Sequence, residues 1–488
     1  MTRTLPPHIV VVGGGMAGLV AAYRLRQAAR ERPLTITLVE AQSRLGGWVE
    51  TLDWQGARVE RGPDSFLTSK PAALQLALEL GLGSQLQAPI PGPTFIAWRG
   101  RLEPLPDGLW LVVPTRLGPI LRSRLLSPWG KASVLLDLVL PPRPRTDDEA
   151  LGALLRRRFG AEFVARIAQP LLHGAYAGDL DEISVQALAP QLAELERRYG
   201  SLIQGARARL RERRTPSQPP FLSLQGGMGT LIDALAAALR PDRPGLTLRL
   251  GTPVTSITGN RANGQAASFT LTLATGERLT AQAVVLATPA FVSAQLLASL
   301  DADLASLLAR IPYEHGATLT LRYPAADLVG IARGRGVLVP AAAGRLISAV
   351  TWVTEKFPDR APAGEALVRV FLVPSHPAAL DAADDVLVSR ALDELAELTG
   401  LRTRPTDALL LRQPNALPIF RVGHRQLVAA IAARCAAWPG LALAGAAYQG
   451  VGLPDCITSG SVAAATVLEA LAQPTAAAGS SADAPASG

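Results

Sequence analysis

Residues 11–25 read VVGGGMAGLVAAYRL and follow the apolar run HIVVV at positions 8–12. A short apolar run that ends in glycines is typical of a buried parallel strand. Gly13, Gly15 and Gly18 have GxGxxG spacing: the first glycine permits a tight turn, the second lets a pyrophosphate approach the backbone, and the third lets helix and strand pack closely. The N–H groups and positive dipole end of the helix that follows favour a phosphate. The stretch therefore predicts a dinucleotide-binding unit at the start of the chain.

The next predicted strand narrows the choice of dinucleotide. A helix is expected from Ala17 to about Arg30, followed by the strand LTITLVE at 34–40, which completes a strand–helix–strand unit. Glu40 ends this strand 22 residues after Gly18, where a carboxylate binds a ribose hydroxyl. Because a carboxylate at this position disfavours the 2′-phosphate of NADP, NAD and FAD remain.

The segments that begin at Glu40 resemble those of a known superfamily. EAQSRLGGWVET at 40–51 resembles the ExxxRxGG segment of the flavin amine oxidases, in which the chain turns back along an extended FAD. ERGPDSF at 60–66 resembles their strand and turn near the isoalloxazine ring. The resemblance implies FAD as the cofactor, contacted by Gly13, Gly14, Gly15, Met16, Ala17, Gly18, Glu40, Arg44, Gly47, Trp48, Gly62, Pro63, Asp64 and Ser65.

Four further stretches resemble one branch of this superfamily, the oxygen-dependent porphyrinogen oxidases that act on protoporphyrinogen IX or coproporphyrinogen III. They are RLEPLPDGL at 101–109, QPLLHGAYAGDLDEISVQA at 169–187, FLSLQGGMGTLIDAL at 221–235 and AGAAYQGVGLPDCITSG at 444–460. The resemblance implies an FAD-dependent oxidoreductase of heme biosynthesis. Such an enzyme converts a porphyrinogen to the porphyrin, removing about six electrons in three flavin cycles while O2 is reduced to H2O2.

The same resemblance implies cofactor contacts far from the N-terminus. The backbone of Val254 is expected to contact adenine, and Val451, Gly452 and Leu453 are expected to present backbone groups to the flavin. Proline suits a helix start and aspartate suits an N-cap, so the pair at 454–455 is expected to begin the last helix.

Substrate contacts are implied at two places. Family analogy puts the backbone of Ala177 and Gly178 against the porphyrinogen. Leu338 and Phe371 could sandwich the ring from a second β-rich block, with ordinary core packing as the alternative. No residue stands out as a general base.

Two positions depart from the porphyrinogen oxidase pattern. Thr94 stands where plant and animal members carry an arginine that pairs with a substrate propionate, and Gln413 stands where many members have tryptophan. The first departure favours the bacterial type, which accepts coproporphyrinogen III. Three other interpretations remain open: a flavin amine oxidase, a carotenoid-type desaturase, and an FAD-binding protein without turnover.

The predicted fold class is α/β, with a Rossmann-like FAD-binding domain of the GR2 type built from both ends of the chain. Strand and helix patterns place a mainly helical insertion at 95–215 and a mixed-sheet substrate-binding domain at 301–429. A disordered tail is expected at 474–488, which is rich in Ala, Ser, Gly and Pro. The FAD-binding domain is expected to comprise 1–90, 220–300 and 430–473.

The chain has 48 Lys and Arg against 40 Asp and Glu, a net charge of +8. Arginine runs such as 156–158 and 207–214 could bind an anionic surface or form a solvated helix face. No aromatic residues interleave with them, so no nucleic acid partner is expected. The helical block at about 95–210, which includes the Leu-, Trp- and Arg-rich stretch 110–129, corresponds by resemblance to the family's membrane-binding region. We expect a cytoplasmic protein with peripheral contact to the cytoplasmic face of the membrane, and a homodimer stays open.

The chain has two cysteines, Cys435 and Cys456, and five scattered histidines. This predicts neither a disulfide framework nor a metal site. Cys456 is expected in the first turn of the last helix, where the helix N-terminus could lower the thiol pKa. Since the implied chemistry needs no thiol, we interpret Cys456 as a structural residue. No apolar run is interpreted as a membrane span.

Overall fold

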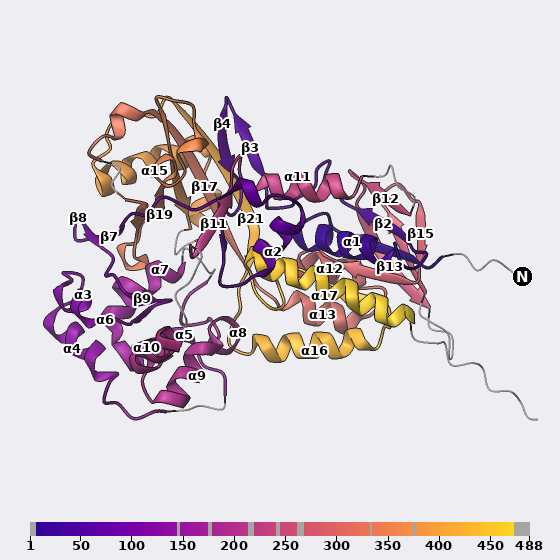
Figure 1. Ribbon diagram of the computed structural model, residues 1–488, viewed down its shortest axis with the longest axis horizontal. Helices are drawn as coiled ribbons and strands as arrows, with labels where there is room; N and C mark the ends of the chain where they lie inside the picture. The colour runs from indigo at the N-terminus through magenta and orange to yellow at the C-terminus, as the bar shows by residue number, and fades with distance from the viewer. Residues whose placement is uncertain are drawn as a thin grey trace, which may run out of the picture.

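In the computed structural model, the chain forms an elongated molecule whose two ends are built differently (Figure 1). One end holds a parallel sheet with its helices, and the other holds a helical bundle beside a large mixed sheet. The fold is α/β, as predicted. The structure describes residues 6–143, 147–173, 178–212, 219–240, 245–260, 268–331, 334–373 and 377–472.

A five-stranded parallel sheet has the order β12-β2-β1-β16-β22 and combines strands from the start, middle and end of the chain. Its central strand is apolar from Ile9 to Val12 because both faces of the sheet are covered. Ile9 and Val11 pack on one side, and Val10 and Val12 pack on the other. The strands are β1 (His8–Val12), β2 (Thr35–Val39), β12 (Leu246–Arg249), β16 (Ala283–Leu286) and β22 (Leu441–Leu443).

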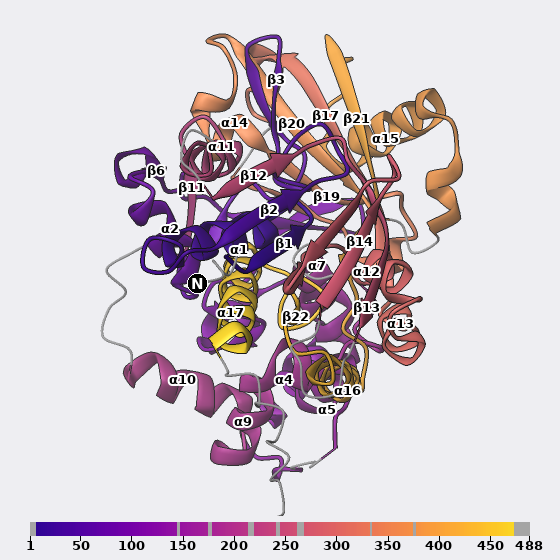
Figure 2. The same ribbon diagram turned by 90° about the vertical axis from the view of Figure 1, so that its right-hand side faces the viewer.

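Two helices, α1 (Met16–Ala28) and α17 (Leu453–Ala472), lie side by side on one face of this sheet (Figures 1 and 2). Gly460 permits their close approach, because a Cβ there would lie 2.2 Å from the carbonyl oxygen of Ala17. By length and composition α17 could also cross a membrane, which the sequence analysis did not expect. Its buried face packs within the same core as α1, which is the placement of a core helix in a folded domain.

The other face of the parallel sheet is covered by a three-stranded antiparallel sheet and by helices. Apolar side chains of this sheet alternate inward, such as Phe269 and Leu271, and share a core with Val10 and Val12. The elements are β13 (Val254–Asn260), β14 (Ser268–Leu273), β15 (Arg278–Ala281), α12 (Ala290–Leu297), α13 (Ala302–Ala309) and α16 (His424–Ala436).

A seven-stranded sheet has the order β21-β17-β20-β19-β18-β7-β8 and is mixed, since β18 pairs with β7 in parallel. Helix α15 (Asp384–Thr399) covers one face, where Leu387 and Leu395 share a core with Val368 and Val370. The strands are β21 (Asp407–Pro418), β17 (Tyr313–Pro324), β20 (Glu365–Leu372), β19 (Ile347–Trp352), β18 (Gly336–Leu338), β7 (Thr94–Trp98) and β8 (Arg101–Pro104).

Strands β7 and β8 lie in the stretch 95–215 that was expected to be mainly helical, yet they join the mixed sheet. The two residues between them, Arg99 and Gly100, have φ angles of 51° and 72°. Two successive residues with positive φ form the tight loop that matches the twist of a β-hairpin. The Arg-Gly pair is therefore the local signal for this hairpin.

The rest of the insertion packs around one apolar core at the lower left of Figure 1. Its longer helices are α3 (Leu117–Arg122), α4 (Pro128–Leu136), α5 (Leu151–Phe159), α9 (Pro190–Tyr199) and α10 (Leu202–Glu212).

The arginine run on α5 is neither a fully solvated face nor a free anionic-surface site. Arg158 is 1% exposed and its Nε donates to Glu196 at 2.8 Å. Arg157 pairs with Glu149 at 2.8 Å, and Arg156 pairs with Asp181. Each arginine of the run therefore has a carboxylate partner, and that of Arg158 lies inside the helical domain.

Short elements join the two ends of the molecule. A hairpin of β3 (Thr51–Trp54) and β4 (Ala57–Glu60) reaches toward the mixed sheet, as Figure 1 shows. The others are β5 (Phe66–Leu67), α2 (Ala72–Glu79), β6 (Leu86–Gln87), β11 (Phe221–Leu224) and α11 (Gly229–Ala238).

Candidate functional site

The turn between β1 and α1 is built from glycines, and at Gly13 and Gly18 no other residue would fit. Gly13 has a φ of +103° and donates its N–H to the carbonyl oxygen of Val39 at 2.8 Å. A Cβ at Gly18 would lie 1.9 Å from the carbonyl oxygen of Gly13, so α1 packs directly on the turn. The first and third glycines of the motif thus have the roles expected from their spacing.

The middle glycine faces open space. A Cβ on Gly15 would have no neighbour within 4 Å among the described residues. The second glycine turn closes one side of this space, because Gly46 donates to the carbonyl oxygen of Gly14 at 2.8 Å and a Cβ on Gly47 would lie 3.3 Å from the Gly15 Cα. We call residues 13–18 with Gly46 and Gly47 the dinucleotide cradle.

Helix α1 begins at this cradle, and the first N–H groups of the helix have no side-chain acceptor. No side chain caps its first turn, and no acidic residue lies there. The first N–H groups of a helix have no intrahelical acceptor, and the helix dipole favours an anion at this end. The cradle therefore has the room, the donors and the electrostatics that a pyrophosphate needs.

Glu40 lies beside the cradle. Its Oε2 accepts from the N–H of Gly14 at 2.5 Å, and its Oε1 accepts from the N–H of Gln42 at 2.8 Å. Each carboxylate oxygen can accept a second hydrogen bond, which leaves capacity for ribose hydroxyls. The backbone of Glu40 also accepts from the N–H of Thr252 at 2.9 Å, which brings the segment that leads into Val254 next to it.

The next predicted contacts, Arg44, Trp48 and Gly62, lie together. Arg44 donates to the carbonyl oxygen of Gly47 at 2.8 Å and pairs with Glu50 at 3.0 Å. A Cβ at Gly62 would lie 2.1 Å from the carbonyl oxygen of Trp48, so only glycine allows these two segments to touch. The structure thus brings the two segments that resemble flavin amine oxidases, 40–51 and 60–66, into direct contact.

The C-terminal turn ends where α17 begins, at Leu453, one residue before the expected start. Asp455 is therefore not the N-cap residue. It lies in the first turn, where its Oδ2 accepts from the N–H of Gly452 at 3.2 Å and both its oxygens accept from Lys70 at 2.7 Å. Gly452 also accepts from the N–H of Cys456 at 3.0 Å, so its backbone serves the start of the helix. Val451 precedes this turn.

Cys456 is not an activated thiol. Burial raises the pKa of Cys456 to about 12, and the charge of Asp455 adds to this. The lowering that a helix N-terminus could produce is therefore outweighed by desolvation.

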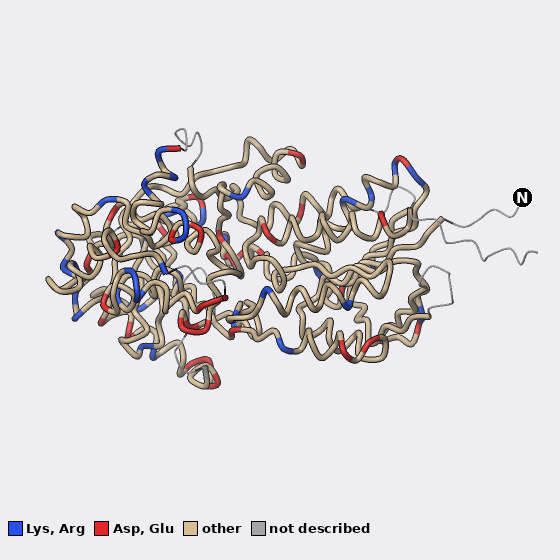
Figure 3. Tube along the Cα trace, turned by 90° about the horizontal axis from the view of Figure 1, so that it is seen from below, with Lys and Arg blue, Asp and Glu red and all other residues tan. Residues whose placement is uncertain are grey.

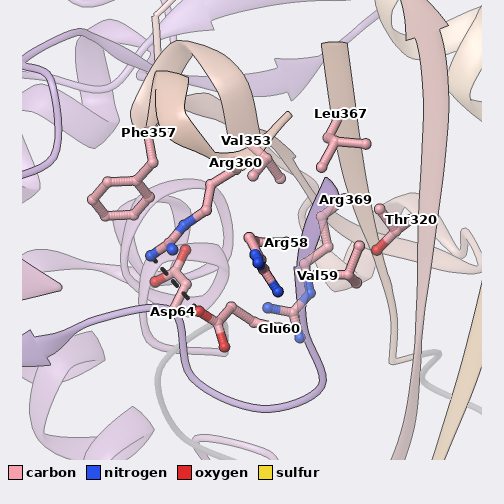
Figure 4. A pocket seen from close by; sticks show the side chains of 10 residues that line it. All are labelled: Arg58, Val59, Glu60, Asp64, Thr320, Val353, Phe357, Arg360, Leu367 and Arg369. Atoms are coloured by element: carbon pink, nitrogen blue, oxygen red, sulfur yellow. Dashed lines mark ion pairs between the residues drawn. The ribbon is translucent and has the colours of Figure 1, made fainter. Parts of the chain in front are cut away.

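A cluster of buried charges lies beneath the turn at 61–65. Figure 4 shows Glu60, Asp64, Arg360 and Arg369 of this cluster, which come from strand β4, the turn after it, the segment after β19, and strand β20. We call this cluster the charged seam, and it consists of Glu60, Asp64, Lys356, Arg360 and Arg369.

Asp64 and Lys356 form the first pair of the seam, with 2.6 Å between Oδ2 and Nζ. Burial by itself would raise the pKa of Asp64, but the charge and hydrogen bond of Lys356 outweigh it, and the pKa is held below its usual value. Ser65 supports the same carboxylate at 2.7 Å. Asp64 is therefore ionised at neutral pH, and Pro63 and Ser65 flank a fixed negative charge.

Glu60 and Arg360 form the second pair, 3.7 Å apart. Burial raises the pKa of Glu60, although Thr51 and the N–H of Met228 each donate to it at 2.8 Å. Arg360 is 1% exposed and donates to Ser223 at 2.9 Å and to the carbonyl oxygen of Leu224 at 3.0 Å.

The predicted substrate residues Leu338 and Phe371 lie on the same face of the mixed sheet. Leu338 pairs with Ala349, and Ala349 pairs with Phe371 in the next strand. Directly paired residues project from the same face. The residues flanking Phe371 on β20 belong to the core under α15, so Phe371 points to the opposite face.

Gly178 lies next to Ile419: its φ is +94°, and an added Cβ would lie 2.6 Å from that side chain. Ala177 lies outside the described residues.

Sequence reasoning missed the cationic half of the seam. Lys356, Arg360 and Arg369 come from about 290–310 positions further along the chain than the turn they hold. One local signal was present: in EALVRVFL, at 365–372, Arg369 alternates with Phe371 on one face of a strand that is otherwise apolar.

Comparisons with known proteins agree with these features. The family described as flavin containing amine oxidoreductase matches residues 16–468. Coproporphyrinogen III oxidase from Bacillus subtilis (strain 168) is 32% identical over 94% of this chain and 98% of its own length. Coproporphyrinogen III oxidase from Propionibacterium freudenreichii subsp. freudenreichii is 36% identical over 95% of this chain and 91% of its own. A crystal structure from Exiguobacterium sp. 255-15 has a TM-score of 0.83 at 33% identity, covering 96% of this chain and 99% of that one.

Proposed function

The chain belongs to the flavin-containing amine oxidoreductase family, and we propose that it uses FAD to oxidise a porphyrinogen to the corresponding porphyrin. The observation that carries this function is the dinucleotide cradle with Glu40 beside it, together with the close contact between the segments at Trp48 and Gly62. The porphyrinogen oxidases found among its relatives over nearly the whole chain support the choice of substrate class.

The residues present fit FAD in distinct roles. The cradle and α1 would hold the pyrophosphate, Glu40 a ribose, and the segment at Val254 the adenine end. The turn at 62–65 and the turn at 451–453 would hold the ring. When bound, FAD supplies the two-electron acceptor that these side chains do not provide.

The protein's own part is to bind, orient and exclude water. Phe371 and Leu338 lie in one row on the same face of the mixed sheet, where a large macrocycle would find apolar side chains, although Leu338 also packs against the core of the helical insertion. Removing six electrons from one porphyrinogen takes three rounds and is balanced by three O2 reduced to three H2O2. We propose O2 as the acceptor on this stoichiometry.

We propose coproporphyrinogen III rather than protoporphyrinogen IX as the preferred substrate. Thr94 supports this, since it carries no charge where the plant and animal enzymes are expected to pair a propionate. The other departure, Gln413, has a structural use here: its Nε2 donates to the carbonyl oxygen of Arg61. An amide can make that hydrogen bond, so the side chain supports the turn next to Gly62.

The test is turnover with both porphyrinogens. The purified protein should be yellow, and aerobic mixing with coproporphyrinogen III should give a fluorescent porphyrin and about three H2O2 per porphyrin. Faster turnover of protoporphyrinogen IX would overturn the preference. Bound flavin without turnover of either would favour the non-catalytic alternative, and turnover of amines instead would favour an amine oxidase.

We also propose peripheral membrane contact through α3, α4 and the segment after them. Trp129 is 84% exposed and Val139 is 77% exposed, and Leu121 and Leu136 are exposed beside them. The stretch 116–136 contains four Lys or Arg and no Asp or Glu, while Figure 3 shows charges of both signs over this end of the molecule as a whole. Apolar side chains among cations suit an anionic bilayer surface, which fits a cytoplasmic protein on the inner face of the membrane.

Co-sedimentation with vesicles tests this contact. The protein should pellet with anionic vesicles at low salt and less with neutral ones. Trp129→Ser should pellet less, while Arg345→Met, on the mixed sheet, should pellet like the wild type. Equal recovery of all three in the supernatant would exclude the contact.

A further inference from the structure

Arg369 occupies an unusual place for a cation. It lies within β20 and is 5% exposed, and both of its strand neighbours, Val368 and Val370, are fully buried. It pairs across the sheet with Thr351 and Thr320, so it sits among interior strands and not at an edge. Burying a charge costs free energy unless the charge is compensated, so a buried arginine at this position indicates a specific role.

Its hydrogen bonds point at the turn that precedes Asp64. Nη1 donates to the carbonyl oxygen of Gly62 at 3.0 Å, and Nη2 donates to that of Arg61 at 3.1 Å. The guanidinium also lies over the ring of Phe371, 4.8 Å from its centre. One side chain therefore links the predicted flavin turn to a predicted substrate residue.

Arg369 forms no ion pair of its own among the described residues, although the nearby charges of Asp64 and Glu60 act on it. Asp64 pairs with Lys356, and Arg360 pairs with Glu60 at 3.7 Å and with Asp359 at 3.9 Å. Arg369 is thus the cation of the seam without an ion pair, and it is the one bound to Gly62.

A small cavity beside Arg369 explains how the guanidinium is accommodated. Its volume of about 20 Å³ is enough for one water molecule (Figure 4). The Nε of Arg369, the Nη1 of Arg360 and the Oγ1 of Thr320 have no hydrogen-bond partner among the described residues, and all three residues line this cavity. A buried water would accept from the two arginine N–H groups and donate to the Thr320 hydroxyl, without neutralising the charge.

We propose that Arg369 is a positioning residue that keeps a buried positive charge at the Gly62 turn, where it stabilises the negative charge of reduced flavin. This inference rests on the proposed function, because the flavin is its partner. It also sets the geometry of the turn, since the same guanidinium holds two successive carbonyl groups and Phe371.

The test is the midpoint potential of bound flavin in matched variants. Arg369→Met removes the charge and both hydrogen bonds, and Arg369→Lys keeps the charge without the fork. Arg345→Met is the control, because Arg345 pairs with the exposed Glu397 at 2.7 Å and its loss changes the net charge equally. We expect Arg369→Met to lower the equilibrium constant for flavin reduction about tenfold, which is about 30 mV for two electrons.

Arg369→Lys and Arg345→Met should stay close to the wild-type potential. An unshifted potential in Arg369→Met would overturn the inference, as would an equal shift in Arg345→Met. If Arg369→Met fails to fold, Arg369→Lys decides: a full tenfold loss there would show that the charge is not what matters. Wild-type protein that binds flavin and turns over a porphyrinogen establishes the proposed function by itself, so these outcomes judge Arg369 alone.

Discussion

The dinucleotide cradle and the charged seam lie at the two ends of the same predicted cofactor site and are built from opposite materials. The cradle consists of backbone and absent side chains: Gly13, Gly15 and Gly18 leave room, and α1 supplies N–H groups. The seam consists of charged side chains that are buried, such as Arg360, or half-buried, such as the pair Asp64–Lys356. A phosphate keeps its charge throughout and needs only a fixed receptor. A redox ring changes its charge, so the residues around it must set an energy as well as a shape.

Gly18→Ala should have the largest effect of any change at the cradle. The new Cβ would lie 1.9 Å from the carbonyl oxygen of Gly13, which is backbone and cannot rotate away. We expect a loss of about 3 kcal/mol or more in the free energy of unfolding, at the upper end for overpacked sites. Denaturant unfolding of the flavin-free protein would measure it. Wild-type stability in this variant would show that α1 does not pack on the turn as described.

Gly15→Ala tests whether the open space at Gly15 is needed for ligand binding and not for folding. Its Cβ would meet nothing within 4 Å among the described residues, and the φ of −71° is ordinary for alanine. The flavin-free variant should therefore unfold like the wild type, while FAD should bind on the order of tenfold more weakly, about 1.4 kcal/mol. Paired titrations of FAD and denaturant would show this. Unchanged FAD affinity would mean that the pyrophosphate lies elsewhere.

Lys356→Met tests the seam in the same way. It would leave the half-buried Asp64 carboxylate without its cation, and we expect a loss of about 2 kcal/mol in the free energy of unfolding, the usual value of a hydrogen bond to a charged group. Thermal unfolding at pH 7 would measure it. Lys131→Met, on α4, is the matched control and should change little.

The pH dependence of this effect has a defined sign. The folded pKa of Asp64 is below its unfolded value, so the stability it contributes is present above the unfolded pKa of about 4 and is lost as pH falls through the folded pKa. In Lys356→Met the isolated carboxylate would bind a proton more readily. The deficit of the variant should therefore narrow on acidification, and a deficit that grows between pH 6 and pH 4 would contradict the pairing.

The cradle could be predicted from sequence and the seam could not, for a physical reason. The contacts of Gly13, Glu40 and Gly46 fall within about 30 residues of one another, and each glycine has a local steric role that spacing reveals. Lys356 lies 292 positions from Asp64, and a single charged residue carries no signal for a partner at that distance.

The strand β21 was missed for a related reason. Its prolines at 414 and 418 argue against a strand, but β21 is at the edge of the mixed sheet, where a missing N–H costs no ladder bond. The sequence could show the proline but not that the strand lies at an edge.

Cys456→Ala should have the smallest effect, although Cys456 lies in the turn that closes the cofactor site. Its thiol is neutral at physiological pH because burial raises its pKa to about 12, so it offers neither charge nor nucleophile. Loss of the sulfur removes about one methylene equivalent of buried surface, about 1 kcal/mol or less. The variant should keep FAD and turn over a porphyrinogen at a rate close to that of the wild type, whereas Gly452→Val should lose FAD. An inactive alanine variant that retains its flavin would show that this end of the site, too, depends on a side chain.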